Sequence, residues 1–377
     1  MTDLYGNRAD ETYTYRRVSW PDFVEGSDLG NVTSGSVELS AFSELKSTCS
    51  FSFEGGEEPG TNDLVRIYYS FDDDYGEHAE YCIGTFFVGY ANTTYSLDGD
   101  SLMASGDVDG WSVLKALQDV QMGYAYTVPA GTQPVAKAVE LIQGVGLPVN
   151  AANESSYELT SDHTFEPTDS LLTVVNWLCT TANFQAPYPD AYGTVQLTRY
   201  IEPSERTTVA EFSDGELSIM YPELVIENDW QEIPNVYKLY YSTDALAMHA
   251  EARNITGSKA SLDARGGREL SEVASVSELA GEDSAAMLDN LKSMAETKLL
   301  NNSQEIERVE LSHPYIPLMA NDAVSVKYAD TAWSGNVQNM KISLEPSTKC
   351  DTVLRRFVPS SITVETSGSI DWEVQDG

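Results

Sequence analysis

The sequence is short of cysteine, and the cysteines it has are not paired. Four occur in 377 residues, with no Cys-x-x-Cys spacing among them: Cys49, Cys82, Cys179 and Cys350. Scattered single cysteines provide neither the ligand set of a zinc site nor a disulfide framework. Since Cys49, Cys82 and Cys179 lie in strand-like or helix-like runs, we expect buried free thiols.

Long apolar runs and a leader are also missing. No run approaches the roughly 18–20 uncharged apolar residues that a membrane-spanning helix needs. The first residues, "MTDLYGNRADETYTYRR", do not combine a basic end with an apolar stretch, as a signal peptide does. We therefore expect a protein that is made in a cytoplasm, has no membrane span and does not enter the secretory route on its own.

Basic residues are scarce. Twenty-two Lys and Arg stand against 59 Asp and Glu, so the formal net charge is −37 and the pI about 4.2. This balance argues against a protein that grips nucleic acid, which needs clustered cations, and against binding to anionic membranes. Two interpretations of the charge stay open: it keeps the protein soluble, or it forms a surface that repels DNA, such as the wall of a conduit.

Catalytic and metal-binding patterns are absent as well. None of the four histidines has ligand spacing to another histidine or to a cysteine: His78, His163, His249 and His313. The motifs Gly-x-Ser-x-Gly, Gly-x-Gly-x-x-Gly and the P-loop do not occur. The acidic stretch "DDDYGE" at 72–77 lacks the spacing of a calcium loop, so we expect an exposed hairpin turn there. We predict no catalytic, cofactor-binding or metal-binding residues and no enzymatic activity.

Strand-like segments dominate what is present, and they suggest an α+β protein that is mainly β. Residues 1–108 contain short alternating runs such as "STCSFSFEG", separated by turns, which favours a small barrel or sandwich. Residues 109–200 predict an α+β unit with three helices. Residues 201–360 return to strands, with one helix inserted near 277–302, and residues 361–377 are expected to form a C-terminal tail.

The expected helices follow ordinary capping and stripe rules. Thr132 is expected to cap the second helix, and Thr168 or Asp169 the third. The inserted helix is expected to bury Leu291 and Met294, among others, on one side.

A proline-flanked corner stands out at 311–328, "LSHPYIPLMANDAVSVKY". Val324 and Val326 alternate with polar residues, as in a half-buried strand. Asn321 and Asp322 are expected to form a turn, because their short side chains bond nearby backbone groups. The segment therefore predicts a strand, a corner and a second strand.

One compact basic spot occurs in this acidic chain, "ARGGRELSEV" at 264–273. An arginine pair around two flexible glycines suits the carboxylates of a neighbouring acidic subunit. We therefore predict a subunit-interface loop formed by Arg265, Gly266, Gly267 and Arg268.

The order of the segments resembles the hub proteins at the end of bacteriophage tails. This family includes the contractile-phage baseplate hub and the structural N-terminal part of siphophage tail-associated proteins. The pieces that carry the resemblance include "IGTFFVGYANTTYSLDGDSLMASGDVDGWSVLKAL", "YTVPAGTQPVAKAVELI", "FEPTDSLLTVVNWLCTTANF", "ARGGRELSEV" and "LSHPYIPLMANDAVSVKY". Together they cover most of residues 15–360.

The resemblance implies a ring-forming homotrimer in which each subunit has two tail-tube-like β-barrels joined by small α/β units. Three subunits would present six barrels and so adapt a six-fold tail to a three-fold tip. The implied partners are a distal tail or tail tube protein, a tape measure protein, and a tail fibre, spike or receptor-binding protein. DNA would pass transiently through the channel without specific binding, and the protein would lie in the virion at the distal end of the tail.

Three alternatives stay open at this stage. A hexameric distal tail ring protein shares the first barrel type but does not need the second β region. A non-viral carbohydrate-binding β protein would stack sugars on exposed aromatics such as Trp20, Trp230, Trp333 and Trp372. A hydrolase has no support in the motifs.

Overall fold

The computed structural model of the chain consists of two compact units. It describes residues 8–30, 32–55, 64–73, 75–98, 101–152, 157–201, 205–214, 220–228, 230–243, 246–276, 279, 283–302, 306–357 and 362–373. Unit 1 comprises residues 1–224 and 310–354, and unit 2 comprises residues 225–309 and 355–377. The chain therefore passes between the units three times, and each unit is described by itself below.

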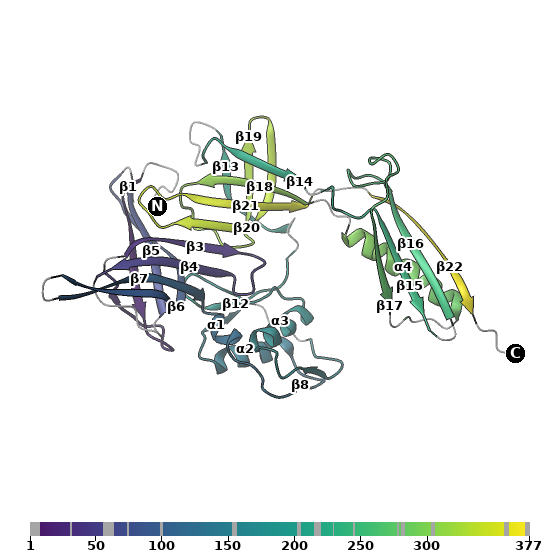
Figure 1. The fold of residues 1–377 in the computed structure, drawn as a ribbon, viewed down its shortest axis with the longest axis horizontal. Coiled ribbons are helices and arrows are strands. Elements are labelled where there is room, and N and C mark those ends of the chain that lie inside the picture. The colour runs from purple at the N-terminus through teal and green to yellow at the C-terminus, as the bar shows by residue number, and fades with distance from the viewer. Residues whose placement is uncertain are drawn as a thin grey trace. The chain divides into compact units, whose positions relative to one another are not determined.

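The largest sheet has thirteen strands (Figure 1). The strands that come before the helices are β1 (Arg8–Val18), β2 (Glu25–Asp28), β3 (Val32–Ser40), β4 (Ser47–Glu54), β5 (Leu64–Asp73), β6 (His78–Asp98) and β7 (Ser101–Ser112). Those that come later are β13 (Thr208–Ser213), β14 (Leu224–Asn228), β18 (Ile306–His313), β19 (Ala323–Tyr328), β20 (Thr331–Ser343) and β21 (Cys350–Phe357). Their order is β14-β18-β21-β20-β3-β4-β7-β6-β5-β1-β2, with β19 beside β20 and β13 beside β19.

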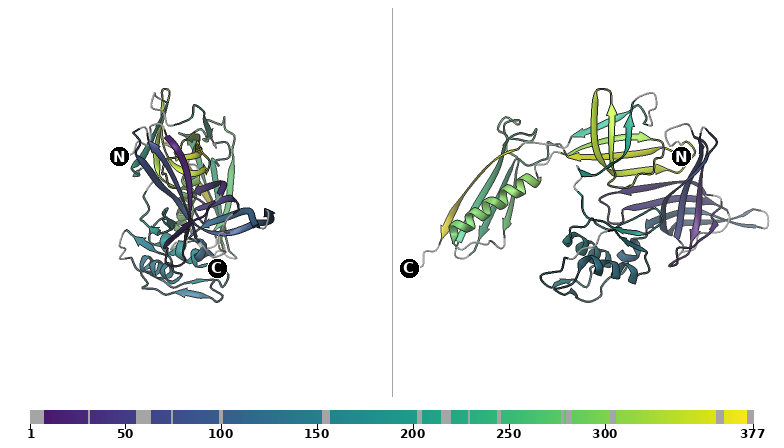
Figure 2. Two further views of the ribbon diagram at one scale, coloured as in Figure 1. Left: turned by 90° about the vertical axis from the view of Figure 1, so that its left-hand side faces the viewer. Right: turned by 180° about the vertical axis from the view of Figure 1, so that it is seen from behind.

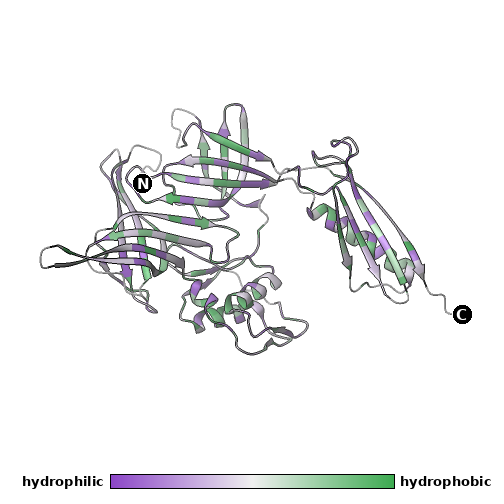
Figure 3. Cartoon of the chain, in the orientation of Figure 1, coloured by the Kyte–Doolittle hydropathy of each residue, from purple (hydrophilic) through white to green (hydrophobic). Residues whose placement is uncertain are grey.

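The pairing of β3 with β20 joins the two β regions of the sequence. The strands are antiparallel, with Val37 opposite Ile342 and Leu39 opposite Met340, and all four side chains are buried. Apolar and polar residues alternate along many of these strands, as a sheet with one buried face requires (Figure 3). The regions expected to form two separate barrels thus share one sheet, and hydrogen bonds between the described strands do not close it into a barrel.

The small α+β part of unit 1 packs beside this sheet. Its elements are α1 (Lys115–Gln118), β8 (Tyr126–Val128), α2 (Pro134–Gly144), β9 (Val149–Ala151), β10 (His163–Phe165), α3 (Leu171–Thr181), β11 (Tyr188–Pro189) and β12 (Val195–Leu197). Its core includes Ile142 and Leu178 from the helices together with Val18 and Leu64 from the large sheet. The three predicted helices are present. The first is a single turn, because the segment before it continues strand β7.

The predicted helix caps are wrong by one or two residues. Gln133 precedes α2 without a side-chain cap, and Pro134 occupies its first turn. Ser170 caps α3, because its hydroxyl accepts a hydrogen bond from the Thr173 amide at 3.1 Å. Short polar residues cluster before α3, so the sequence alone did not distinguish among them.

Unit 2 is a four-stranded sheet with one long helix, α4 (Ser284–Asn302), along one face (Figure 2). The strand order is β17-β15-β16-β22, with bounds β15 (Val236–Ser242), β16 (Leu246–Thr256), β17 (Ser271–Val276) and β22 (Thr363–Glu373). Leu291, Ala295 and Leu299 are the fully buried helix residues. The expectation for Leu291 is confirmed, whereas Met294 is 38% exposed because it points away from this seam.

Two further expectations for this region need correction. The inserted helix begins at Ser284, and residues 277, 278 and 280–282 of the expected helix lie outside the described residues. The expected C-terminal tail contains β22, which pairs with β16 along nearly its whole length. Pairing with β16 satisfies the backbone of this segment, "TVETSGSIDWE".

Candidate subunit-contact sites

The predicted interface loop lies between β16 and β17 in unit 2 and is anchored by a buried asparagine. Asn235 is fully buried, and its side-chain amide donates to the carbonyl of Arg268 at 3.0 Å. Its side-chain oxygen accepts from the Leu270 amide at 2.8 Å. Gly266 and Gly267 have φ values of 62° and 84°, which non-glycine residues rarely adopt. The glycines therefore fix a tight backbone path rather than leave the loop free.

The two arginines of this loop have different environments. The Nη2 group of Arg265 donates to the carbonyl of Trp230 and, at 3.2 Å, to that of Gln231, and its guanidinium lies 5.9 Å from the Trp230 ring. Arg268 is exposed, and it forms no ion pair with any of the described residues. Arg265 thus contacts backbone groups within unit 2, and Arg268 is the arginine whose side chain faces solvent. Subunit contact by this loop stays a prediction.

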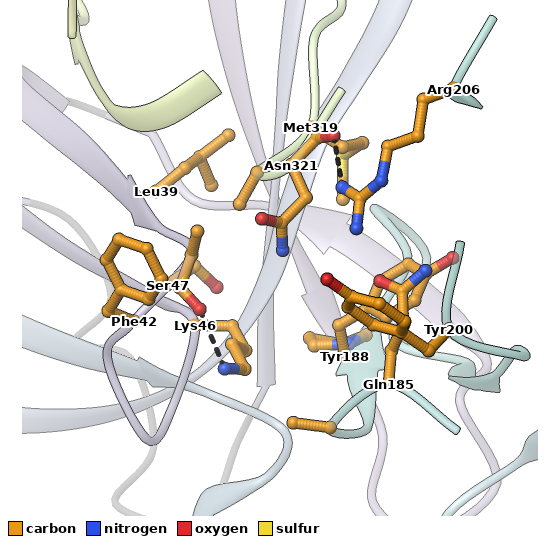
Figure 4. A pocket seen from close by; sticks show the side chains of 14 residues that line it. Leu39, Phe42, Lys46, Ser47, Gln185, Tyr188, Tyr200, Arg206, Met319 and Asn321 are labelled. Carbon is orange, nitrogen blue, oxygen red and sulfur yellow. Dashed lines mark hydrogen bonds between the residues drawn. The ribbon is translucent and has the colours of Figure 1, made fainter. Parts of the chain in front are cut away.

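Unit 1 contains a concave site that the sequence did not reveal (Figure 4). It has a volume of about 210 Å³ and is formed by three parts of the chain that are far apart in sequence: the turn after β3, residues 185–200 with Arg206, and the corner after β18. The residues that define its character are Phe42, Lys46, Tyr188, Tyr200, Arg206 and Met319. We call it the aromatic pocket.

Two cations are fixed at the rim of the aromatic pocket. Lys46 donates through Nζ to the Ala41 carbonyl at 2.9 Å, and burial lowers the pKa of this amine. Arg206 donates through Nη1 to the Asn321 carbonyl at 2.7 Å, as Figure 4 shows. Phe42 and Tyr200 remain 61% and 43% exposed, so the pocket opens to solvent.

The corner noted in the sequence forms one wall of the aromatic pocket. Asp322 accepts a hydrogen bond from the Met319 amide at 2.7 Å, and Asn321 adopts a φ of 73°. The predicted turn is therefore confirmed, and so is the strand after it, in which Val324 and Val326 are fully buried. The sequence marked this corner, but no local signal connected it with Lys46 or Arg206.

Comparison with known proteins establishes the fold. No protein-family model and no curated protein matches the sequence. The solved tail protein from Neisseria meningitidis MC58 has a TM-score of 0.59 at 11% identity, over 92% of this chain and 97% of that protein. The prophage MuSo2 43 kDa tail protein from Shewanella oneidensis has a TM-score of 0.60 at 12% identity, over 91% and 97%. This chain has the fold of these tail proteins.

The histidines of this tail-protein fold are engaged separately. His163 stacks on Trp177 with ring centroids 4.0 Å apart, and His313 is fully buried beside Thr352. His78 and His249 each lie next to one aspartate, Asp72 and Asp371 respectively. Within the described ranges, no three His, Cys, Asp or Glu side chains come together as metal ligands.

The described helices of the tail-protein fold include none that is both long and apolar enough to span a membrane. The four cysteines are free, and three of them are buried. The sequence-based expectation of unpaired thiols is therefore confirmed.

Proposed function

We propose that the protein is a structural hub of a bacteriophage tail, built as a ring-forming homotrimer. Each subunit contributes two tail-tube-like β regions that share one sheet, so that six such regions meet a six-fold tail above and a three-fold tip below. The observation that carries the proposal is the fold match. It extends over more than nine-tenths of both this chain and the two tail proteins.

The charge supports a passage for DNA. A surface with a net charge of −37 per subunit repels phosphates instead of binding them. In the proposed hub, acidic residues around the channel let DNA slide through during ejection without specific contacts. The hub has no catalytic role in this proposal.

The proposed place is the distal end of the tail in the virion. There the hub contacts a distal tail or tail tube protein above, the tape measure protein inside, and a fibre, spike or receptor-binding protein below. These partners follow from the resemblance in the sequence and agree with a protein that uses its surface for assembly.

Native mass spectrometry with negative-stain imaging of the same sample tests the proposal. The expected result is a species of three 41.4 kDa subunits with a central hole and a pseudo-six-fold outline. A ring of six subunits would instead identify a distal tail ring protein. A rigid monomer that binds glycans on an array would favour the carbohydrate-binding alternative.

The packing of the tryptophans disfavours that last alternative. Trp20 packs edge-on against Phe23 and Phe87, and Trp333 is only 9% exposed. Trp372 is 46% exposed but is a single ring on an edge strand. Sugar-binding platforms need accessible aromatic faces, and two of the four candidates do not offer one.

A further inference from the structure

The turn between β5 and β6 presents a tyrosine in a fixed position. The Asp73 carboxylate accepts hydrogen bonds from the backbone amides of Tyr75 at 2.9 Å and Glu77 at 2.8 Å. The Asp73 backbone closes the turn further through its hydrogen bonds with Gly76 and Glu77. Gly76 adopts a φ of 75°, as this tight turn requires. The backbone that carries the Tyr75 side chain is thus ordered before any partner binds.

Tyr75 has no packing role that explains this order. It is 83% exposed, more than any other large apolar or aromatic side chain among the described residues. Asp72 and Glu77 lie on either side of it in the sequence and are solvent-accessible, and Asp72 is 2.9 Å from the Nδ1 atom of the exposed His78. A preorganised, exposed tyrosine between carboxylates has the features of an interface anchor, because its ring is large and its ordering cost is already met.

The aromatic pocket is complementary to this turn. Its volume of about 210 Å³ exceeds the roughly 150 Å³ in which an apolar cavity holds a benzene ring. Phe42 and Tyr200 offer ring faces, and Lys46 and Arg206 supply cations beside them. The nearby Glu44 carboxylate accepts a hydrogen bond from Gln118 at 2.8 Å and does not line the pocket. The pocket thus combines aromatic faces with cations, and the turn combines an aromatic ring with carboxylates.

The turn and the pocket of one chain lie too far apart to meet. Thr48 is next to the pocket, and successive cross-strand partners lead from it to Trp111, then Phe87, then Leu64 at the start of β5. Asp73 lies nine residues further along β5. At about 3.3 Å per residue the separation along the strand is roughly 30 Å. Contact between the two sites therefore requires two copies.

We propose that Tyr75 of one copy inserts into the aromatic pocket of the next copy. Asp72 and Glu77 then lie near Lys46 and Arg206 of the neighbour. Because the two surfaces differ, the contact is head-to-tail, and a rotation that closes after three copies gives the proposed ring. The inference rests on the self-association proposed above and names the residues that produce it.

Cysteine crosslinking between chains tests the contact directly. Tyr75→Cys and Ser47→Cys are made in separate chains, since Ser47 lines the pocket. Under mild oxidation, the mixture is expected to form a disulfide-linked dimer, whereas each variant alone forms none. A Tyr124→Cys chain mixed with Ser47→Cys is the matched control, because Tyr124 is 65% exposed but lies in another loop. Dimers of Tyr75→Cys alone, or equal crosslinking with the control, would overturn the proposal.

Substitution of the tyrosine separates this contact from the hub proposal. In native mass spectrometry, Tyr75→Ala is expected to raise the Kd of self-association at least tenfold. Glu77→Lys is expected to raise this Kd by less, and Tyr124→Ala is expected to leave it unchanged. If wild type and Tyr75→Ala both form trimers of equal stability, the contact is wrong and the hub proposal stands. If the wild type stays monomeric at about 100 µM, well above the Kd of a stable assembly, both proposals fail.

Discussion

The guanidinium of Arg66 donates its Nη1 hydrogen to the carboxylate of Glu25 and so joins strand β5 to strand β2. Arg66 is 6% exposed, and its other nitrogens donate to Thr85 Oγ1 at 3.0 Å and to the Tyr192 carbonyl at 2.9 Å. Tyr192 belongs to the turn between β11 and β12. One buried cation therefore holds the large sheet and the α+β part together.

Replacing Glu25 with Gln should destabilise unit 1. The hydrogen bond from Tyr68 and the bond from Arg66 lower the pKa of the Glu25 carboxyl, so the wild-type group is charged at neutral pH. Removing one member of a buried ion pair costs about 3–5 kcal/mol, and a partly exposed carboxylate reduces this to about 1–3 kcal/mol. Urea unfolding followed by circular dichroism measures the change.

Asp28→Asn is the matched control for this experiment. Asp28 is 63% exposed and forms its ion pair with Arg16 at 3.5 Å, so its loss should cost less than about 0.5 kcal/mol. Equal unfolding midpoints for the Glu25 and Asp28 variants would contradict the role given to Arg66.

The buried His313 should make stability depend on pH. Burial lowers the pKa of its imidazole from the ordinary 6.5 to about 4. Below pH 6.5 the unfolded chain binds a proton that the folded chain excludes, so the free energy of unfolding falls as the pH drops from 6.5 to 4. The full loss is about 3.5 kcal/mol at 1.4 kcal/mol per pKa unit. Above pH 6.5 the imidazole is neutral in both states, and this stability is fully present.

The pH effect is measured as a difference between two chains. Urea unfolding of the wild type and of His313→Gln at pH 7 and pH 4.5 cancels the contribution of the carboxylates. The wild type should lose more stability than the variant across this interval. Parallel curves would show that His313 does not carry the effect.

The interface loop offers a test in which folding and assembly are separated. Arg268→Glu should weaken trimer formation while changing the unfolding free energy by less than about 0.5 kcal/mol, because the side chain is exposed. Arg265→Glu should also destabilise unit 2 by about 1–3 kcal/mol, since it leaves the carbonyls of Trp230 and Gln231 without their donor. Sizing by light scattering and urea unfolding of each variant provide the two readouts.

The double variant of Arg265 and Arg268 to Glu should block assembly. Lys292→Glu is the control for a charge reversal elsewhere in unit 2, because the Lys292 side chain is 31% exposed and its Nζ lies 3.3 Å from Asp289. Normal trimers of the double variant would reject the loop as a subunit contact.

The free thiols should be unreactive in the folded protein. Burial raises the pKa of Cys179 and of Cys350 to about 12 and that of Cys49 well above its usual range. Burial likewise raises the pKa of the Cys82 thiol to about 12. Since the thiolate is the nucleophile, Ellman's reagent at pH 8 should titrate less than one thiol rapidly, and four after addition of urea. Rapid reaction of one thiol in the native state would show an exposed cysteine.

Sequence patterns located the strands and helices because their signals are local. Val324 and Val326 revealed β19 through simple alternation. Gly266 and Gly267 were interpreted as flexible, whereas their positive φ values fix the backbone of the loop. Met294 was misplaced because α4 mixes apolar and polar residues on several sides. The contact of α4 with the sheet, and not the periodicity of its sequence, decides which helix residues are buried.

The aromatic pocket could not be predicted because its parts meet only in the fold. Phe42 and Arg206 are separated by more than 160 residues, and neither belongs to a motif. Arg265 was interpreted as available for a neighbouring subunit, since the sequence does not show that the Trp230 carbonyl lies within its reach. Long-range pairing is the missing information in each case.

The antiparallel pairing of β3 with β20 has a consequence for synthesis of the chain. One edge of β3 pairs with β4 soon after synthesis, but the other edge, at Ser36 to Ser40, pairs with Ser343 to Asn339, about 300 residues later. A ribosome adding 5–20 residues per second leaves that edge open for roughly 15–60 s. Non-local closure of this kind also slows folding and exposes a strand to unwanted pairing. The connectivity of this protein therefore leaves one strand edge unpaired during most of its synthesis.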